Sequence, residues 1–150
     1  MSPETGVAAR WAPVVAWAAL IFVASTSWFA GPHTESIILP VLAWLFPRAD
    51  PHTLATMHAI IRKLAHFTEY LILSVLISRA MRDARGWRLE HAILAVALAT
   101  VYAVSDEVHQ RFVPGRTAAA GDVGIDALGA FVGQIGIAFR AFRRGDRRAH

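Results

Sequence analysis

The strongest constraint on the fold is a run of twenty residues without a charge, Trp11–Ala30. At 1.5 Å per residue, a helix of this length reaches about 30 Å, the thickness of the hydrocarbon core of a bilayer. The run is too long for the core of a signal peptide, and Trp28 and Phe29 do not suit a small-residue cleavage site. The segment is therefore predicted to be an uncleaved transmembrane helix.

The composition also indicates a membrane protein. Hydrophobic residues make up 55% of the chain and charged residues 17%, and the mean hydropathy is +0.42, which is unusual for a soluble domain of this length. The absence of cysteine excludes disulfides, thiol nucleophiles and thiolate metal sites. The arginines fall at the ends of apolar segments instead of along one aromatic-studded face, so no nucleic-acid partner is expected.

Three further apolar segments are long enough to cross a bilayer. The sequence thus predicts an all-α fold, a polytopic four-helix transmembrane bundle in one domain covering 1–150, with spans at about 11–30, 63–81, 90–109 and 122–142. Between the first two spans, Ile37–Phe46 is interrupted by Pro40 and too short to cross, so a short interfacial segment is expected there.

Turn and cap residues define the connections between the spans. Asp50 followed by Pro51 is typical of an N-cap and a first helical position, so the second helix should begin well before its span. Pro114 and Gly115 predict a turn between the third and fourth helices.

The distribution of basic residues predicts the orientation. With four spans, ten arginines fall on the side of the two termini and five basic residues on the other side. Both termini, including the arginine-rich tail 143–150, are therefore expected in the cytoplasm. The arginine-rich end Arg140–Arg148 could also hold anionic lipid headgroups, but marking of the topology is the favoured interpretation.

In this topology, polar residues from all four helices meet at one depth on the extracytoplasmic side. The layer contains Ser25, Thr26 and Ser27; Lys63, His66 and Glu69; Asp106, Glu107 and Gln110; and Asp122 and Asp126. Ionisable residues in membrane segments are costly, and they mark a functional site by default.

Helical spacing groups the layer into stripes. The stripes are Arg62, His66 and Glu69; Tyr102, Asp106 and Gln110; and Asp122 and Asp126 with Gly129, Gly133 and Gly136. Glu69 lies about 9 Å deeper than Lys63, so it is the deepest acid of its helix. The glycines are expected to let another backbone approach closely within the monomer.

The motifs and their order resemble the VanZ-like family of bacterial membrane proteins. They are Lys63–Tyr70, Asp106–Gln110, Pro114–Arg116 and Asp122–Asp126 with Gly129, and the resemblance covers about residues 15–140. Asp126 stands where many members have Asn. The resemblance implies a protein of the bacterial cytoplasmic membrane that acts in the cell envelope, in a family named for resistance to the glycopeptide teicoplanin.

Two functions stay open for the polar layer. It could bind the headgroup of an envelope lipid or a glycopeptide, through Lys63, His66, Glu69, Asp106, Glu107, Gln110, Arg116, Asp122 and Asp126. It could instead be an enzyme on an envelope lipid or polyprenyl phosphate, with Glu69 or Asp106 as general base, His66 as proton shuttle, and Arg116 or Lys63 as the stabilising cation. Binding ranks first because no nucleophile motif or phosphate-binding loop is present. A proton relay is disfavoured, since the polar residues do not cross the bilayer.

Structural roles are the alternative for each residue. Five acids face four basic residues in the layer, a balance that favours an internal ion-pair network. Asp122 could simply cap its helix, and Arg111 could complement a helix dipole. Five carboxylates with His66 or His109 could hold a divalent metal, but their spacing matches no ligand signature, so no metal or cofactor is expected. His52 and His58 are expected at the surface.

Overall fold

A computed structural model of the chain describes residues 3–27, 31–81, 87–114 and 120–146. These residues form five helices and no strand, as an all-α fold requires. The helices are α1 Pro3–Ala24, α2 Gly31–Leu45, α3 Pro51–Met81, α4 Leu89–Gln110 and α5 Ala120–Asp146.

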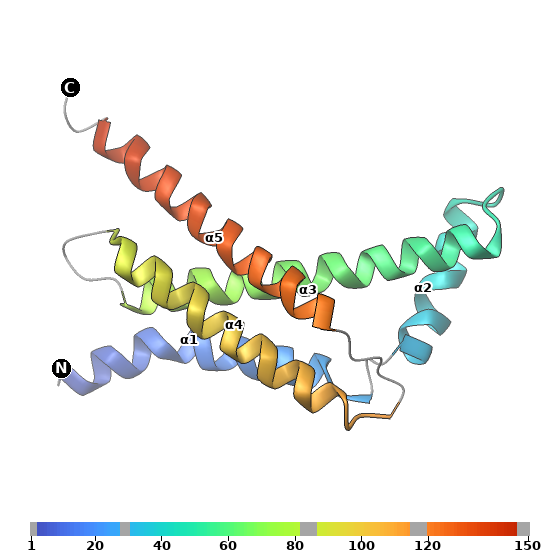
Figure 1. The fold of residues 1–150 in the computed structure, drawn as a ribbon, viewed down its shortest axis with the longest axis horizontal. Helices are drawn as coiled ribbons and strands as arrows, with labels where there is room; N and C mark the ends of the chain where they lie inside the picture. The colour runs from blue at the N-terminus through green and yellow to red at the C-terminus, as the bar shows by residue number, and fades with distance from the viewer. Residues whose placement is uncertain (1–2, 28–30, 82–86, 115–119, 147–150) are drawn as a thin grey trace.

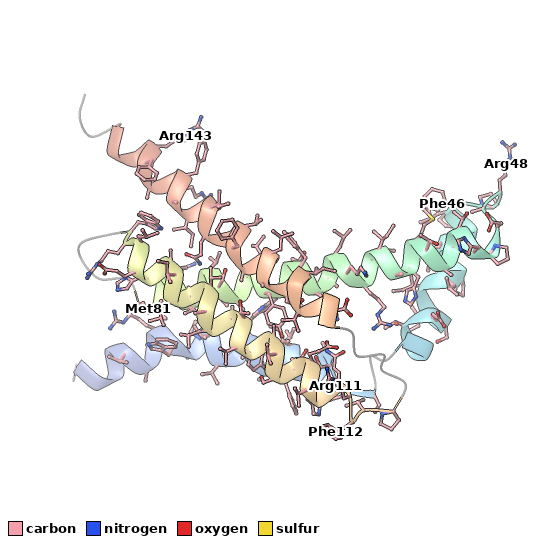
Figure 2. All side chains as sticks on the ribbon, in the orientation of Figure 1. Phe46, Arg48, Met81, Arg111, Phe112 and Arg143 are labelled. Atoms are coloured by element: carbon pink, nitrogen blue, oxygen red, sulfur yellow. The ribbon has the colours of Figure 1, made fainter. Side chains whose placement is uncertain are left out.

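Helix α3 lies at the centre of the arrangement and contacts each of the other four helices. The start of α1, the end of α3, the start of α4 and the end of α5 lie toward one side of the molecule (Figure 1). We call this side the basic end. The opposite end, formed by the end of α1, the end of α4 and the start of α5, is called the polar end. Arg111 and Phe112 lie at the polar end, whereas Met81 and Arg143 lie at the basic end (Figure 2).

Three helices are long and apolar enough to cross a membrane, namely Gly6–Ala24, Leu89–Gln110 and Gly121–Arg143. The predicted second span, 63–81, belongs to the 31-residue helix α3, which does not meet this standard by itself. The polar residues along this helix, among them Arg62, Lys63, His66 and Glu69, lower its hydropathy. The structure thus supports three spanning segments by length and composition, where the sequence analysis expected four.

Helix α1 begins at Pro3, eight residues before the predicted span, and it also ends early. The helix ends at Ala24, six residues before the end of the predicted segment 11–30. The Thr26 hydroxyl donates a 2.7 Å hydrogen bond to the Val23 carbonyl, and the Thr26 N–H bonds the same oxygen at 3.1 Å. Hydroxyl side chains that bond the backbone in this way compete with helical hydrogen bonds, which explains the early end. Helix α4 matches its predicted span to within one residue, and α5 continues past 142 to Asp146.

The start of α3 is the one that the sequence predicts. Asp50 Oδ1 accepts hydrogen bonds from the N–H groups of His52 at 2.9 Å and Thr53 at 3.1 Å, and Oδ2 accepts one from the Thr53 hydroxyl at 2.6 Å. The Thr53 hydroxyl and N–H stabilise the carboxylate and hold the pKa of Asp50 below its usual range. Asp50 is therefore the N-cap, and Pro51 opens the helix.

The expected interfacial segment forms the helix α2, which packs on α3. His58 of α3, expected at the surface, is instead only 3% exposed. Its Nε2 lies 3.3 Å from the Thr34 hydroxyl and its Nδ1 lies 3.8 Å from a carboxylate oxygen of Glu35. The expectation for His58 was wrong because the sequence did not reveal that α2 would cover it.

Helices α3 and α5 are in contact through their backbones. A Cβ atom at Gly129 would overlap the Phe67 carbonyl, and one at Gly133 would lie 2.8 Å from the Leu71 carbonyl oxygen. Across this contact the Ser74 hydroxyl donates to the Ala130 carbonyl at 2.8 Å. The expected close approach within the monomer is thus present at these two glycines. At Gly136, which shares their face, a Cβ would meet nothing within 4 Å.

We predict that Gly129→Ala destabilises the protein while Gly136→Ala does not. The alanine methyl at position 129 would push against a carbonyl that cannot move without shifting α3, at a cost of about 1–3 kcal/mol. Thermal unfolding of the detergent-solubilised protein, followed by tryptophan fluorescence, measures the difference. Equal transition temperatures for the two variants would contradict the close α3–α5 contact.

Candidate functional site

Asp106 is the central acid of the polar end, and it is only 4% exposed. Its Oδ2 accepts a 2.8 Å hydrogen bond from the Ser25 hydroxyl and another of 2.8 Å from Gln110 Nε2. Gln110 lies one turn further along α4, and Ser25 is supplied by the turn that ends α1. Because α1 ends before Ser25, the hydroxyl of this residue can reach the buried carboxylate of Asp106.

Asp126 is the second buried acid, at 3% exposure, and it faces His66 of α3. His66 Nδ1 lies 3.5 Å from Asp126 Oδ1, with 16% of the His66 side chain exposed. This separation is that of an ion pair and is longer than a good hydrogen bond. The pair follows from the backbone contact described above, since His66 adjoins Phe67 and Asp126 lies one turn before Gly129.

Aromatic side chains lie on the membrane side of the two acids. The Tyr102 hydroxyl donates to the Ala18 carbonyl at 2.7 Å, and Trp17 Nε1 donates to the Glu69 carbonyl at 2.9 Å. The rings of Tyr70 and Tyr102 are 6.3 Å apart. Tyr70 is fully buried and within electrostatic range of both Asp106 and Asp126. The two acids thus belong to one electrostatic site, which we call the polar cluster: Ser25, His66, Tyr70, Asp106, Gln110 and Asp126.

Several polar atoms of the polar cluster have no hydrogen-bond partner among the described residues. Four such atoms are buried, namely His66 Nδ1, the Tyr70 hydroxyl, Asp106 Oδ1 and Asp126 Oδ1. An unmade hydrogen bond at a buried polar group is costly, and most such groups are satisfied in folded proteins. Two of these four atoms are carboxylate oxygens, so the cluster is suited to a group that donates hydrogen bonds, such as a hydroxyl or an amine.

The other predicted site residues differ in how deeply they are buried. Glu107 is buried, at 5% exposure, whereas Glu69 and Asp122 are partly buried. Asp122 lies in the first turn of α5, where its negative charge interacts favourably with the positive end of the helix dipole. Lys63 is exposed. Arg116 lies outside the described residues.

The expected network of basic residues with the acids is not found in the described part of the chain. Arg62, Lys63 and Arg111 form no ion pair there, and the ion pair of Asp126 is with His66. Arg111 instead caps the end of α4, in agreement with the dipole interpretation. Burial of Asp106 and Asp126 is therefore offset by hydroxyl, amide and imidazole groups.

The described residues contain no group of three or more His, Asp or Glu side chains placed to hold a metal ion. Asp106 is hydrogen-bonded to a hydroxyl and an amide, whereas Asp126 pairs with an imidazole. Such mixed surroundings resemble hydrogen-bonding sites more than the shells of oxygen ligands around Ca²⁺ or Mg²⁺.

A groove of about 420 Å³ runs between α1 and α3 next to the polar cluster. Apolar side chains line most of it, among them Leu20, Leu64 and Ile72, and Thr68 and Glu69 supply its polar lining. Because the groove is open along the side of the helices, an apolar chain could lie in it with a polar group near Glu69.

Sequence reasoning missed three residues that shape this region. Tyr70 stands within a quoted motif but gave no separate signal, and Trp17 looked like one more apolar residue of its helix. Ser74 was also overlooked, although a hydroxyl within an apolar run is a usable signal for a hydrogen bond between helices. In each case the partner is a main-chain carbonyl or a residue of another helix, which the sequence does not reveal.

Apolar helices of spanning length with buried polar side chains at one end define a helical membrane protein. Residues 10–141 match the VanZ/LLP1 family, so the chain belongs to that family. Neither the curated proteins nor the solved structures provide a match to this chain.

We predict that Ser25→Ala lowers the stability of the protein by about 1–3 kcal/mol, because buried Asp106 would lose a hydrogen-bond donor. Thr26→Ala is the matched control, since the Thr26 hydroxyl bonds only within α1 and its bond is exposed. Thermal unfolding in detergent compares the two variants. If both changed the transition equally, the Ser25–Asp106 bond would have no special contribution.

Proposed function

We propose that the protein binds the polar headgroup of an envelope lipid or a glycopeptide in the polar cluster, and thereby alters envelope chemistry or drug access. The observation that carries this proposal is the buried carboxylate oxygen Asp106 Oδ1, which has no hydrogen-bond partner among the described residues, beside Asp126 Oδ1, which has only the 3.5 Å ion pair with His66. Both candidate ligands carry hydroxyl or amine donors that match these acceptors.

The groove between α1 and α3 supports a ligand with an apolar part. Its lining is mainly aliphatic and includes Glu69, which lies one turn from His66 along α3. A lipid could place an acyl chain there and its headgroup at the polar cluster. Family membership supports the same setting, because the family is named for teicoplanin resistance.

The proposed topology has four passes, with α3 as the fourth spanning helix. Its second half carries the buried residues Tyr70, Leu73 and Ile77 and is surrounded by the three apolar helices, so few of its polar groups need to face lipid. Both termini would be cytoplasmic because arginines are concentrated at the basic end. The polar cluster would then face the extracytoplasmic side.

A second candidate function is an enzyme on an envelope lipid. The observation that favours it is the His66–Asp126 pair, in which a carboxylate orients an imidazole whose other nitrogen could exchange a proton. In this alternative His66 acts as the shuttle and Asp106 or Glu69 as the base. Binding without reaction ranks first because the sequence contains no nucleophile motif or phosphate-binding loop.

We predict that Asp106→Asn and Asp126→Asn each weaken headgroup binding by about ten- to hundredfold, the loss expected for a charge-assisted hydrogen bond. Binding of fluorescent teicoplanin and of labelled envelope lipids to the purified protein in nanodiscs provides the measurement. Glu90→Gln is the control, because Glu90 pairs with Arg88 in the exposed first turn of α4, away from the polar end.

Three outcomes would reject the binding proposal. If neither probe binds the parent protein, or if the Asn variants bind as well as the parent, the acids have a structural role. If a labelled lipid is converted to a new product, and His66→Gln abolishes the conversion, the enzyme alternative takes its place.

For the topology, we predict that a single cysteine introduced at Phe112 is labelled from outside intact cells. Phe112 is 81% exposed at the polar end, and the parent chain has no cysteine that could interfere. A cysteine at Arg143, at the basic end, should be labelled only after the cells are opened. The reverse pattern would contradict the proposed orientation.

A further inference from the structure

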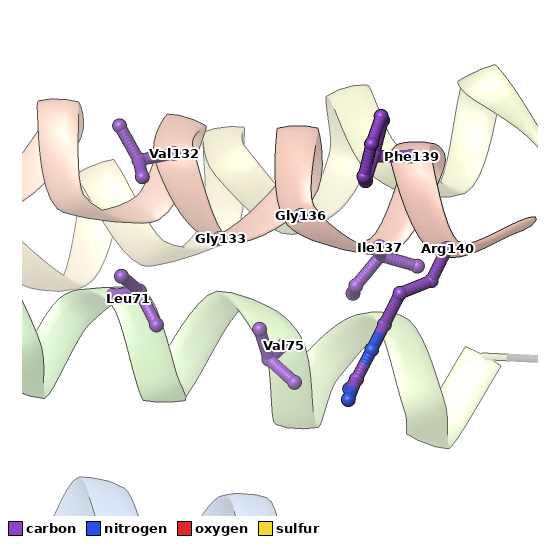
Figure 3. A pocket seen from close by; sticks show the side chains of 8 residues that line it. All are labelled: Leu71, Val75, Val132, Gly133, Gly136, Ile137, Phe139 and Arg140. Carbon is purple, nitrogen blue, oxygen red and sulfur yellow. The ribbon is translucent and has the colours of Figure 1, made fainter. Parts of the chain in front are cut away.

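A second groove lies between α3 and α5, toward the basic end of the molecule. It measures about 470 Å³ and is lined by Leu71, Val75, Val132, Gly133, Gly136, Ile137, Phe139 and Arg140. Figure 3 shows Leu71 and Val75 reaching from α3 toward α5, and Arg140 extending from α5 across the end of the groove. Seven of the eight lining residues are apolar or glycine, and Arg140 supplies the charge.

The groove exists because α3 and α5 separate after their backbone contact. At Gly133 a Cβ atom would still lie 2.8 Å from the Leu71 carbonyl oxygen, whereas at Gly136 it would meet nothing within 4 Å. The two helices diverge toward the end of α5 (Figure 1). In a bilayer, an apolar wedge of this kind is filled by an acyl chain or by another protein.

The size and the charge of the groove select a lipid as its occupant. From Val132 to Arg140 the helical rise is about 12 Å, close to the roughly 15 Å of hydrocarbon in one leaflet. An acyl chain in the groove would therefore place its phosphate at the depth of Arg140, where a guanidinium can bind it with two hydrogen bonds.

The surroundings of Arg140 are basic. Exposed Arg79 lies in the last turn of α3, and Arg143 lies one turn beyond Arg140 with its guanidinium 4.8 Å from the centre of the Phe139 ring. Neither α3 after Glu69 nor the part of α5 between Asp126 and Asp146 contains an acidic residue. The segments that line the groove thus complement an anionic headgroup, whereas the exposed acid Glu90 at this end lies on α4, which does not line the groove.

We propose that the groove between α3 and α5 is a binding site for an anionic phospholipid, with one acyl chain on Gly136 and the phosphate on Arg140. This site is separate from the polar cluster, and the proposal does not depend on what the polar cluster binds. It assigns a function to Arg140 beyond marking topology.

Native mass spectrometry of the full chain, with phosphatidylglycerol and phosphatidylcholine of identical acyl chains, tests this site. The parent protein should retain phosphatidylglycerol in preference. Arg140→Gln should reduce that preference by about fivefold, the effect expected for one basic residue at a membrane surface. Gly136→Leu should lower the occupancy of both lipids, because its side chain would fill the groove without meeting the protein.

Matched controls separate the site from general effects. Gly124→Leu adds the same side chain to α5 at another open position, and Arg111→Gln removes an exposed arginine at the polar end. Both should bind lipid as the parent does. Soluble glycerol phosphate should not compete, because the groove contributes through the acyl chain.

The proposal is overturned if the parent shows no preference for phosphatidylglycerol, or if Arg111→Gln lowers the preference as much as Arg140→Gln. It is also overturned if the parent is a dimer that Gly136→Leu dissociates, since a second copy of the chain would then occupy the groove. Competition by glycerol phosphate alone would reduce the site to a simple phosphate contact.

Discussion

The close backbone contact between α3 and α5 is the constraint on which the other features depend. With glycine at positions 129 and 133, the α5 backbone lies directly against the carbonyls of Phe67 and Leu71. Side chains next to this contact have little freedom, so His66 is held against Asp126 on one side of it and Ser74 bonds Ala130 on the other. Where the contact ends, the helices separate and leave the groove at Gly136.

Burial of the acids has a cost that the structure offsets only in part. Asp106 Oδ2 receives two hydrogen bonds, while Asp106 Oδ1 and Asp126 Oδ1 have no hydrogen-bond partner among the described residues. A buried carboxylate is tolerated only when other groups compensate for its lost hydration. Residues from three helices and from the turn that ends α1 hold these two carboxylates in place although their burial is costly. A role in recognition therefore explains the arrangement better than a contribution to stability does.

Much of the fold could be predicted because membrane helices obey simple rules. Length and lack of charge predicted a spanning helix within α1 and the bounds of α4, and the Asp50–Pro51 pair predicted the first residue of α3. The end of α1 was not predicted, because neither the bond from Thr26 to Val23 nor the bond from Ser25 to Asp106, 81 positions away, is visible in an uncharged segment. The burial of His58 likewise depends on α2, whose packing on α3 no local pattern indicates.

The candidate site was predictable in its residue types but not in its pairings. Asp106 and Gln110 share one helical face, so their contact follows from spacing alone. Lys63 looked equally promising, yet it is exposed and pairs with no described residue. A lysine at a helix surface near the edge of a membrane gains hydration by extending outward, whereas a short aspartate on the inner face cannot reach water.

The two ends of the molecule therefore differ in the chemistry they offer. Buried carboxylate oxygens at the polar end attract donors and repel phosphate, while the arginines at the basic end attract phosphate and repel amines. A phosphate-bearing ligand of the polar cluster would have to keep its phosphate outside the cluster, near exposed Lys63, and insert only hydroxyl or amine groups. Discrimination at the cluster would then come from the sugar or amine portion of a headgroup, because that is the portion that can reach Asp106 and Asp126.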